Sequence, residues 1–133
     1  MKVADLMQTD VKTVDPEILL DEAMLTLADS HVTALPVVDQ SGKMLGVLSR
    51  TDVLAAEEEV ESRAERDRLL ARTRVRDLMT PFPLTISPES EVRTAAQQML
   101  SAGVHRLYVT TDERVVGVIS MSDIVRAVAV GAL

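Results

Sequence analysis

Apolar residues recur along the chain at two different spacings, and each spacing predicts one kind of element. Helical spacing is found at Leu19, Leu20, Ala23, Met24, Leu27 and Ala28. The stretch LPVVD, the turn QSGK and then MLGVLS predict a β-hairpin, because two apolar runs flank a glycine-containing turn. A short β segment, VKTV, comes before the helix and ends at Asp15-Pro16, since a residue before proline favours an extended backbone. A second helix is predicted to begin at Ser49.

This order of elements occurs twice. VADLMQTDVKTVDPE, from Val3, aligns with VRDLMTPFPLTISPE, from Val75. The alignment continues through Ala23/Ala95, Val32/Val104, Leu35/Leu107 and Val37/Val109. One residue is lost in the turn near Gly42, after which GVLSRTD at 46–52 matches GVISMSD at 117–123. So many matches in the same order indicate an internal duplication, and each copy is predicted to be β-α-β-β-α.

The duplication predicts an α/β (α+β) fold of two units, residues 1–56 and 75–133, that pack through their sheets with pseudo-twofold symmetry. One such unit alone would expose an apolar sheet face and would be only marginally stable. The segment between the copies, residues 57–74, has many charges and no Gly or Pro. We predict a charged, helical linker that continues the helix of Asp52. A solvated connector is the main interpretation, and a partner-binding helix is the alternative.

The composition narrows the classes of function. The net charge of −7, with one Tyr, one Phe and no Trp, disfavours nucleic-acid binding, which needs clustered cations and stacking aromatics. With no Cys and two His, no convincing catalytic triad or metal cluster can be assembled. We therefore predict no enzyme activity, no metal and no required cofactor. No apolar run is long enough to span a membrane, so a soluble cytoplasmic protein is expected.

The two heptapeptides allow two interpretations. Ser49-x-x-Asp52 and Ser120-x-x-Asp123 both have the spacing of a helix capping box, in which the serine and the acidic residue bond to backbone N–H groups. Capping does not explain Gly46 and Gly117, nor the hydroxyls of Thr51 and Ser122. A ligand site would use all of these residues. The helix N-terminus favours phosphate, the carboxylate accepts from a ribose diol, and the glycine lets a flat ring approach the strand.

Both copies resemble CBS (cystathionine-β-synthase-type) domains. The resemblance is carried by LPVVDQSGKMLGVLSRTDVL, VHRLYVTTDERVVGVISMSDIV and the two DLM lead-ins, and it covers nearly the whole chain outside the connector. It implies a stand-alone tandem pair, a Bateman module, that binds AMP, ADP, ATP, S-adenosylmethionine or NAD. In that family the motif aspartate holds ribose hydroxyls. The implied contacts are Asp52, Thr51, Ser49, Pro81, Val104 and His105 in one site, and Asp123, Ser122, Ser120, Thr9, Val32 and Thr33 in the other.

The segment VHRLYV distinguishes the second copy from the first. It resembles the HRL segment that contacts nucleotide phosphates in the γ subunit of AMP-activated protein kinase. The resemblance implies that Arg106 pairs with a phosphate and that His105 donates to it. The first copy has Thr33-Ala34 at those places and offers no cation there. A single cationic pole favours a mono- or diphosphate over a more highly charged ligand.

The leading hypothesis is therefore a regulatory module that senses an adenosine-containing ligand and relays its occupancy to an effector protein. Modules of this family often pair, so a homodimer forming a disc of four CBS units is expected. No contact with nucleic acid or membrane is expected. The alternative is a dimerisation scaffold that binds no nucleotide and uses both heptapeptides only as helix caps.

Overall fold

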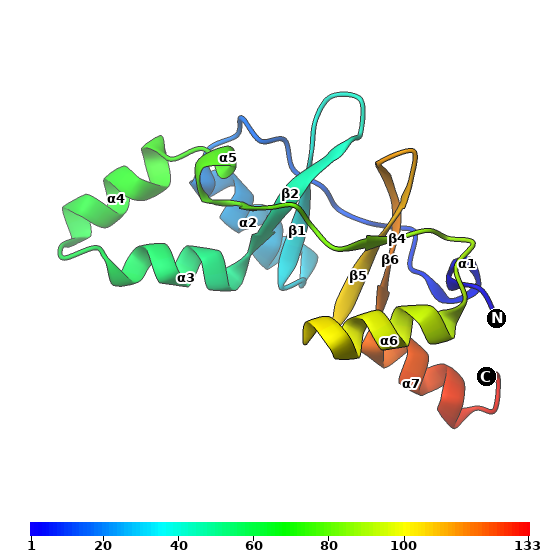
Figure 1. The fold of residues 1–133 in the computed structure, drawn as a ribbon. Helices are drawn as coiled ribbons and strands as arrows, with labels where there is room; N and C mark the ends of the chain where they lie inside the picture. The colour runs from blue at the N-terminus through cyan, green and yellow to red at the C-terminus, as the bar shows by residue number, and fades with distance from the viewer. The chain divides into compact units, whose positions relative to one another are not determined.

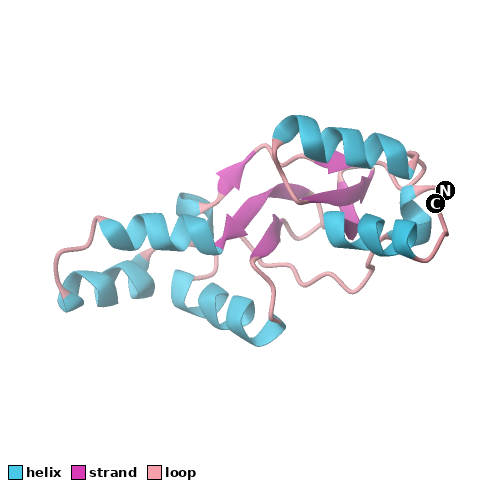
Figure 2. Cartoon of the chain, turned by 90° about the horizontal axis from the view of Figure 1, so that it is seen from below, coloured by secondary structure: helices cyan, strands magenta, loops and turns pink.

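The computed structural model describes residues 1–133, which form seven helices and six strands (Figure 1). The chain divides into two compact units. We call residues 12–83 the first unit, and residues 84–133 together with residues 1–11 the second unit. Each unit combines a small three-stranded sheet with helices, which confirms the predicted α+β class (Figure 2). No helix combines the length and the hydropathy that crossing a bilayer requires.

The first unit is built around a β-hairpin. Its elements are α2 (Leu20–Ser30), β1 (Ala34–Val38), β2 (Met44–Ser49), α3 (Arg50–Glu58), α4 (Arg63–Arg72), α5 (Val75–Leu78) and β3 (Thr80–Pro81). The strands pair in the order β1-β2-β3, and both pairs are antiparallel. Its aliphatic core contains the fully buried side chains of Leu20, Leu35 and Leu48. The predicted hairpin, the first predicted helix and the predicted helix start at Ser49 are thus confirmed in this copy.

The first predicted strand, VKTV at residues 11–14, is wrong as a regular strand. Val14 makes only an isolated parallel bridge to Val37, in which the N–H of Val14 donates to the carbonyl of Pro36 (3.1 Å). The corresponding segment of the second copy does form a two-residue strand. Val14 is nevertheless buried, so its side chain serves the core although the backbone pairing is short.

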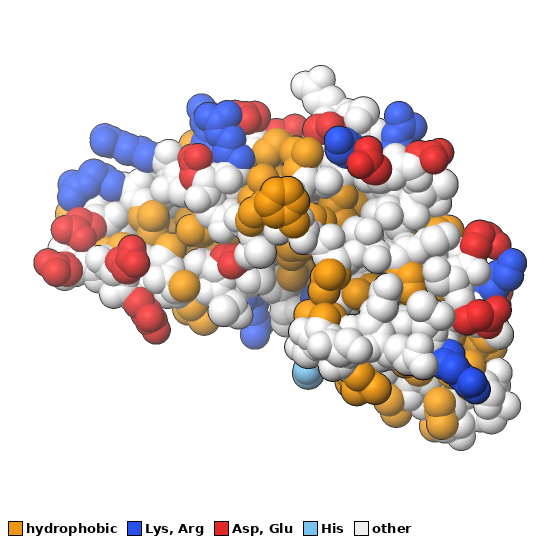
Figure 3. Space-filling model, in the orientation of Figure 1, with side chains coloured by type: hydrophobic (Ala, Val, Ile, Leu, Met, Phe, Trp, Pro, Cys, Tyr) orange, Lys and Arg blue, Asp and Glu red, His pale blue; other side chains and the backbone are white.

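Most of the connector is helical, as predicted, but the prediction that the helix of Asp52 continues through it is wrong. Helix α3 ends at Glu58, and α4 begins at Arg63 after its N-cap residue, Ser62, whose hydroxyl accepts from the N–H of Glu65 (3.2 Å). Leu69 and Leu70 of α4 pack against the core of the first unit. The connector is therefore more than a solvated linker, although charged side chains of both signs cover its outer face (Figure 3).

The second unit repeats the same plan. Its elements are α1 (Val3–Leu6), β4 (Thr85–Ile86), α6 (Val92–Ala102), β5 (Arg106–Thr111), β6 (Arg114–Ser120) and α7 (Met121–Ala129). Strand β4 pairs with β5 in parallel, and β5 pairs with β6 as an antiparallel hairpin. Residues Asp112 and Glu113 form the tight turn with positive φ angles of 51° and 67°. The core includes Met99, Leu107 and Ile119.

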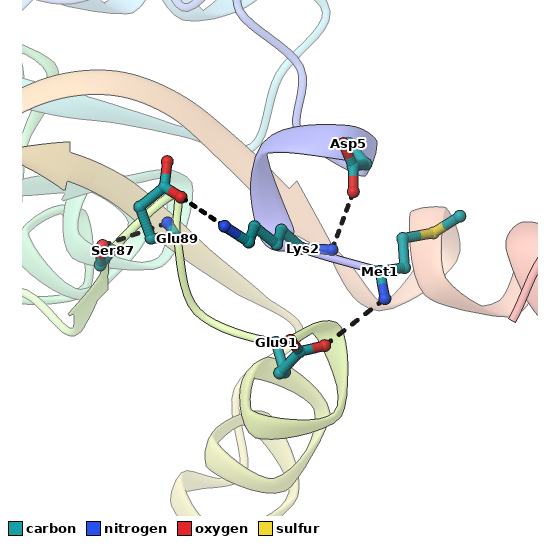
Figure 4. A network of polar contacts seen from close by, with 6 residues as sticks. All are labelled: Met1, Lys2, Asp5, Ser87, Glu89 and Glu91. Carbon is teal, nitrogen blue, oxygen red and sulfur yellow. Dashed lines mark hydrogen bonds and ion pairs between the residues drawn. The ribbon is translucent and has the colours of Figure 1, made fainter.

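The N-terminal segment packs with the second copy of the repeat rather than with its own. The side chain of Val3 is fully buried in the core of the second unit, and its N–H donates to the carbonyl of Ser90 (2.8 Å). Figure 4 shows two ion pairs of the N-terminal segment, that of Lys2 Nζ with Glu89 (2.8 Å) and that of the terminal amine with Glu91 (3.4 Å). These pairs are exposed and contribute little, so the buried valine and the backbone bonds hold the segment.

The lead-in of the second copy makes the reciprocal exchange. Val75 is fully buried in the core of the first unit, and its N–H donates to the carbonyl of Ile18 (3.0 Å). The domain bounds expected from the repeat, 1–56 and 75–133, therefore differ from the compact units. By sequence, Val3 belongs to the first copy of the repeat and Val75 to the second. By packing, Val3 belongs to the second compact unit and Val75 to the first, because each valine is buried in the core of that unit.

Candidate functional site

The N-terminus of α3 has the capping box that the sequence predicts. The hydroxyl oxygen of Ser49 accepts from the N–H of Asp52 (3.1 Å), and Asp52 Oδ2 accepts from the N–H of Ser49 (2.9 Å). Helix α7 repeats this arrangement, with the same two distances between Ser120 and Asp123. The capping interpretation is therefore confirmed for both heptapeptides. Each box leaves Oδ1 of its aspartate available for another contact.

In the first unit, Oδ1 of Asp52 is approached by the segment that follows α5. The hydroxyl of Thr80 donates to it (3.1 Å). Strand β3 places this segment beside β2, with Pro81 opposite Gly46. Asp52 is half-buried, while Thr80 and Pro81 are exposed. A carboxylate has about four acceptor positions, so Asp52 keeps roughly one on each oxygen.

In the second unit, Oδ1 of Asp123 has two neighbours instead of one. Gln8 Nε2 donates to it (3.3 Å) from the segment that follows α1, and Arg126 Nη1 lies 3.5 Å away on the next turn of α7. Gln8 is positioned by a bridge to Val118 of β6. Asp123 is only 8% exposed. The two aspartates thus share a cap but differ in how much of the carboxylate a ligand can reach.

The two heptapeptide glycines have a structural cause. A Cβ atom at Gly46 would lie 2.6 Å from the carbonyl oxygen of Thr80, and one at Gly117 would lie 2.9 Å from that of Gln8. Real Cβ atoms essentially never approach other atoms so closely. The expectation that these glycines admit a flat ligand ring is therefore corrected, because the backbone that follows each DLM lead-in occupies the space.

The amino-acid sequence matches a known protein family over most of its length. The family model of the CBS domain matches residues 3–59 and 75–130, which is most of the chain. The chain belongs to the CBS-domain family. The two matched segments are the two copies recognised in the sequence, so the protein carries a tandem CBS pair.

Two plant proteins are among the relatives. The chain is 32% identical to CBSX1, a chloroplastic CBS domain-containing protein of Arabidopsis thaliana, over 89% of this chain and 59% of that one. It is 29% identical to CBSX2, also chloroplastic and from the same plant, over 94% of this chain and 62% of that one. The chain therefore spans about 60% of the length of these curated relatives.

Solved CBS pairs have the same fold. The crystal structure of CBSX2 in complex with AMP superposes with a TM-score of 0.83 at 30% identity, covering 99% of this chain and 98% of that one. The CBS pair of MJ0100, solved with 5′-methylthioadenosine and S-adenosyl-L-methionine, has a TM-score of 0.79 at 24% identity. That match covers 96% of this chain and 99% of the other, and it shows the shared fold.

The remaining predicted site residues are distributed over the first and second units. Thr51 and Pro81 lie in the first unit with Asp52, and Thr9 and Ser122 lie in the second unit with Asp123; all four are exposed. Val32 and Thr33 also belong to the first unit, where the carbonyl of Thr33 accepts from the N–H of Arg50 (3.0 Å). Their predicted grouping with Asp123 stays a prediction.

Val104, His105 and Arg106 belong to the second unit. The carbonyl of His105 accepts from the N–H of Met121 (2.8 Å), at the start of α7, and the imidazole is exposed. Arg106 and Tyr108 alternate with core residues along β5 and so share its other face. Burial raises the pKa of Tyr108, whereas the charge of Arg106 and a hydrogen bond from it act in the opposite direction. The grouping of Val104 and His105 with Asp52 stays a prediction.

Three residues in contact with the aspartates were not identified from the sequence. They are Gln8, Thr80 and Arg126. Gln8 and Thr80 directly precede Thr9 and Pro81, the residues that the resemblance implied. Neighbouring residues of an extended chain point to opposite sides, so an error of one position exchanges the side chain that reaches the aspartate for one that does not.

Proposed function

We propose that this CBS pair is a regulatory module that binds an adenosine-containing ligand and relays its occupancy to another protein. The observation that carries the proposal is Asp52, a half-buried carboxylate at the N-terminus of α3 with acceptor capacity left on both oxygens. The AMP complex of CBSX2, a structural relative at 30% identity, supports the choice of ligand class.

The chemistry of this position suits a nucleoside monophosphate. The cis-diol of a ribose has two O–H donors, and a carboxylate with one free acceptor position on each oxygen can receive both. The unpaired N–H groups of the first turn of α3 favour an anion such as phosphate. The exposed hydroxyl of Thr51 lies on that turn. AMP, ADP and ATP are therefore the proposed ligands, with S-adenosylmethionine and NAD as further candidates.

A thermal unfolding assay tests this function. At a hundredfold excess over Kd, a ligand that binds only the folded state stabilises it by about 2.7 kcal/mol, which gives an easily measured increase in Tm. We expect AMP or ADP to raise Tm, and we expect the double variant Asp52→Asn/Asp123→Asn to lose most of the increase. The proposal fails if AMP, ADP, ATP, S-adenosylmethionine and NAD all leave Tm unchanged.

We propose a non-catalytic role for this module. CBS pairs are generally regulatory, and CBSX1 is named for its CBS domains alone. The net charge of −7 also argues against a nucleic-acid partner. A cytoplasmic location stays a prediction. The non-catalytic role is tested by incubating the protein with AMP and ATP. Nucleotide turnover that is lost on changing Asp52 or Asp123 would contradict the non-catalytic role.

We further propose that a second copy of the chain is a partner. Leu54 on α3 and Val125 on α7 occupy the same position of the two repeats, and they are 60% and 61% exposed. Beside Leu54, a hollow of about 580 Å³ between α2 and α3 is lined by Met24, Leu27, His31, Val53 and Glu57, among others. Apolar side chains also lie along α7, where Val128 is exposed as well (Figure 3). An apolar position repeated in both units suits a self-complementary interface between identical chains.

The mass in solution tests the dimer. We expect light scattering to give twice the chain mass for the wild type, and the monomer mass for Leu54→Glu/Val125→Glu. Gln97→Glu, at an exposed polar position of α6, should leave the dimer intact. A wild-type monomer would contradict the dimer. A dimer that binds none of the nucleotides would instead support the alternative function, a ligand-independent scaffold.

A further inference from the structure

The repeat supplies an internal comparison for every contact of the motif aspartates. Thr80 and Gln8 occupy the same position after the DLM lead-ins, and each donates to Oδ1 of an aspartate. Three residues after each aspartate, the first copy has Ala55 and the second has Arg126. Only the arginine adds a second contact, at 3.5 Å. Two differences in the repeat thus account for the unequal surroundings of Asp52 and Asp123.

The consequence for a ligand follows from acceptor positions and access. Asp123 accepts from the N–H of Ser120 on Oδ2, and from Gln8 with Arg126 beside it on Oδ1, so roughly one of its four acceptor positions remains. The contacts of Gln8 and Arg126 are long, at 3.3 and 3.5 Å, and hence individually weak. Together these side chains nevertheless cover the carboxylate, which is 8% exposed. A sugar diol must displace at least one of them.

Charge reinforces this difference. The side chain of Arg126 is 69% exposed, so it can move away, but its guanidinium offsets the negative charge of Asp123 while it stays. Asp52 has no ion pair, and its Oδ1 partner is the neutral hydroxyl of Thr80. A ribose hydroxyl therefore meets an accessible carboxylate with no ion pair in the first unit, and a covered carboxylate paired with a guanidinium in the second.

We propose that Gln8 and Arg126 are specificity-determining residues that disfavour nucleoside binding at Asp123 and so make Asp52 the stronger binding carboxylate. This inference rests on the proposed function. Gln8 and Arg126 act through the carboxylate that they cover and need not touch the ligand. Removing them improves binding at Asp123, whereas the loss of residues with a merely structural role would weaken it.

A reciprocal exchange between the repeats tests the inference by calorimetry with AMP. Two backgrounds isolate the sites: Asp52→Asn leaves Asp123, and Asp123→Asn leaves Asp52. We expect AMP to bind about tenfold more weakly in the Asp52→Asn background, a difference the size of one hydrogen bond to a charged group. Adding Gln8→Thr and Arg126→Ala to that background, which copies the surroundings of Asp52, should recover most of the tenfold loss.

The converse exchange and a matched control complete the test. Adding Thr80→Gln and Ala55→Arg to the Asp123→Asn background should weaken AMP binding by a similar factor. The pair Gln97→Thr/Arg93→Ala makes the same changes at exposed positions of α6 and should alter neither site. Circular dichroism and unfolding curves confirm that each variant is folded.

The outcomes separate this inference from the proposed function. If the wild type binds AMP but Gln8→Thr/Arg126→Ala gives no gain at Asp123, the inference is wrong and the proposed function stands. A loss of affinity in that variant would also contradict it, because Arg126 or Gln8 would then be a ligand contact. If neither the wild type nor any variant binds AMP, ADP or ATP, the proposed function fails and the inference fails with it.

Discussion

The starts of α3 and α7 are nearly identical in sequence and in capping geometry, yet they present their aspartates differently. Asp52 and Asp123 make the same bonds to the serines of their own motifs, with the same distances. They differ in the residues that come from the segments after the lead-ins and from the next helical turn. A cap is a local property of four residues, whereas the availability of a carboxylate depends on residues far away in the sequence.

The glycines ahead of the two motifs give the largest expected effect on stability. A Cβ atom at Gly46 would lie 2.6 Å from the backbone oxygen of Thr80, closer than the 2.9 Å between a Cβ atom at Gly117 and the backbone oxygen of Gln8, while a methionine side chain adds to the crowding at both positions. We expect Gly46→Ala to lower the free energy of unfolding by about 2 kcal/mol and Gly117→Ala by less. Urea denaturation measures both. Equal losses of unfolding free energy would show that the backbone lies equally close to both glycines, and would contradict this difference between the two regions.

The serine caps should respond equally in the two regions. Ser49→Ala and Ser120→Ala each remove one acceptor from the first turn, and we expect each to cost about 1 kcal/mol of unfolding free energy. Ser62→Ala, at the cap of α4, is a matched control on a helix with no buried residue and should cost no more. If one motif serine cost twice as much as the other, the two caps would not be equivalent.

The helices before each hairpin end differently. His31 closes α2 with a φ of 55°, and Gly103 closes α6 with a φ of 67°. Because a side chain is unfavourable in this left-handed conformation, we expect His31→Gly to raise the free energy of unfolding by roughly 0.5–1 kcal/mol. Gly103→Ala should lower it by about 1 kcal/mol. Denaturant midpoints test the direction of both changes. If His31→Gly lowers the free energy of unfolding, the imidazole makes a contact that stabilises the fold by more than the left-handed backbone costs.

Tyr108 in the second unit corresponds to Pro36 in the first, and it gives a spectroscopic test of this face of β5. Burial raises the pKa of Tyr108 above its usual 10.0. Because the folded state retains the proton more strongly, the stability from this group is complete below about pH 10 and is lost as the pH rises through the folded-state pKa. Tyr108 is the only tyrosine, so phenolate absorbance follows it alone. A midpoint below 10.0 would contradict the burial, and Tyr108→Phe should lose this pH dependence.

The sequence predicts the parts of this structure that are encoded locally. The hairpins, the helices at 20–30 and 92–102 and both capping boxes follow from spacing within each copy. The exchange of the lead-ins does not, because Val3 and Val75 match and would suit either core equally well. The break between α3 and α4 is also hidden, since residues 59–62 contain no glycine or proline to mark it.

The repeat predicts only part of the candidate site, because some of the residues that contact the aspartates differ between the two copies. Both aspartates and their serines are marked by the repeat, but Gln8, Thr80 and Arg126 belong to positions where the copies differ. The alignment of the two copies marks positions that match, and therefore does not mark these three residues. The differences between two copies of a motif therefore carry information about specificity, and the matches carry information about folding.

The most direct test of the unequal aspartates is an NMR titration of the wild type with AMP. The backbone amides of Ser49 and Asp52 report on one carboxylate, and those of Ser120 and Asp123 report on the other. We predict that the Ser49 and Asp52 signals shift at AMP concentrations about tenfold lower than those that shift Ser120 and Asp123. Signals that shift together, or Ser120 and Asp123 shifting first, would contradict the account.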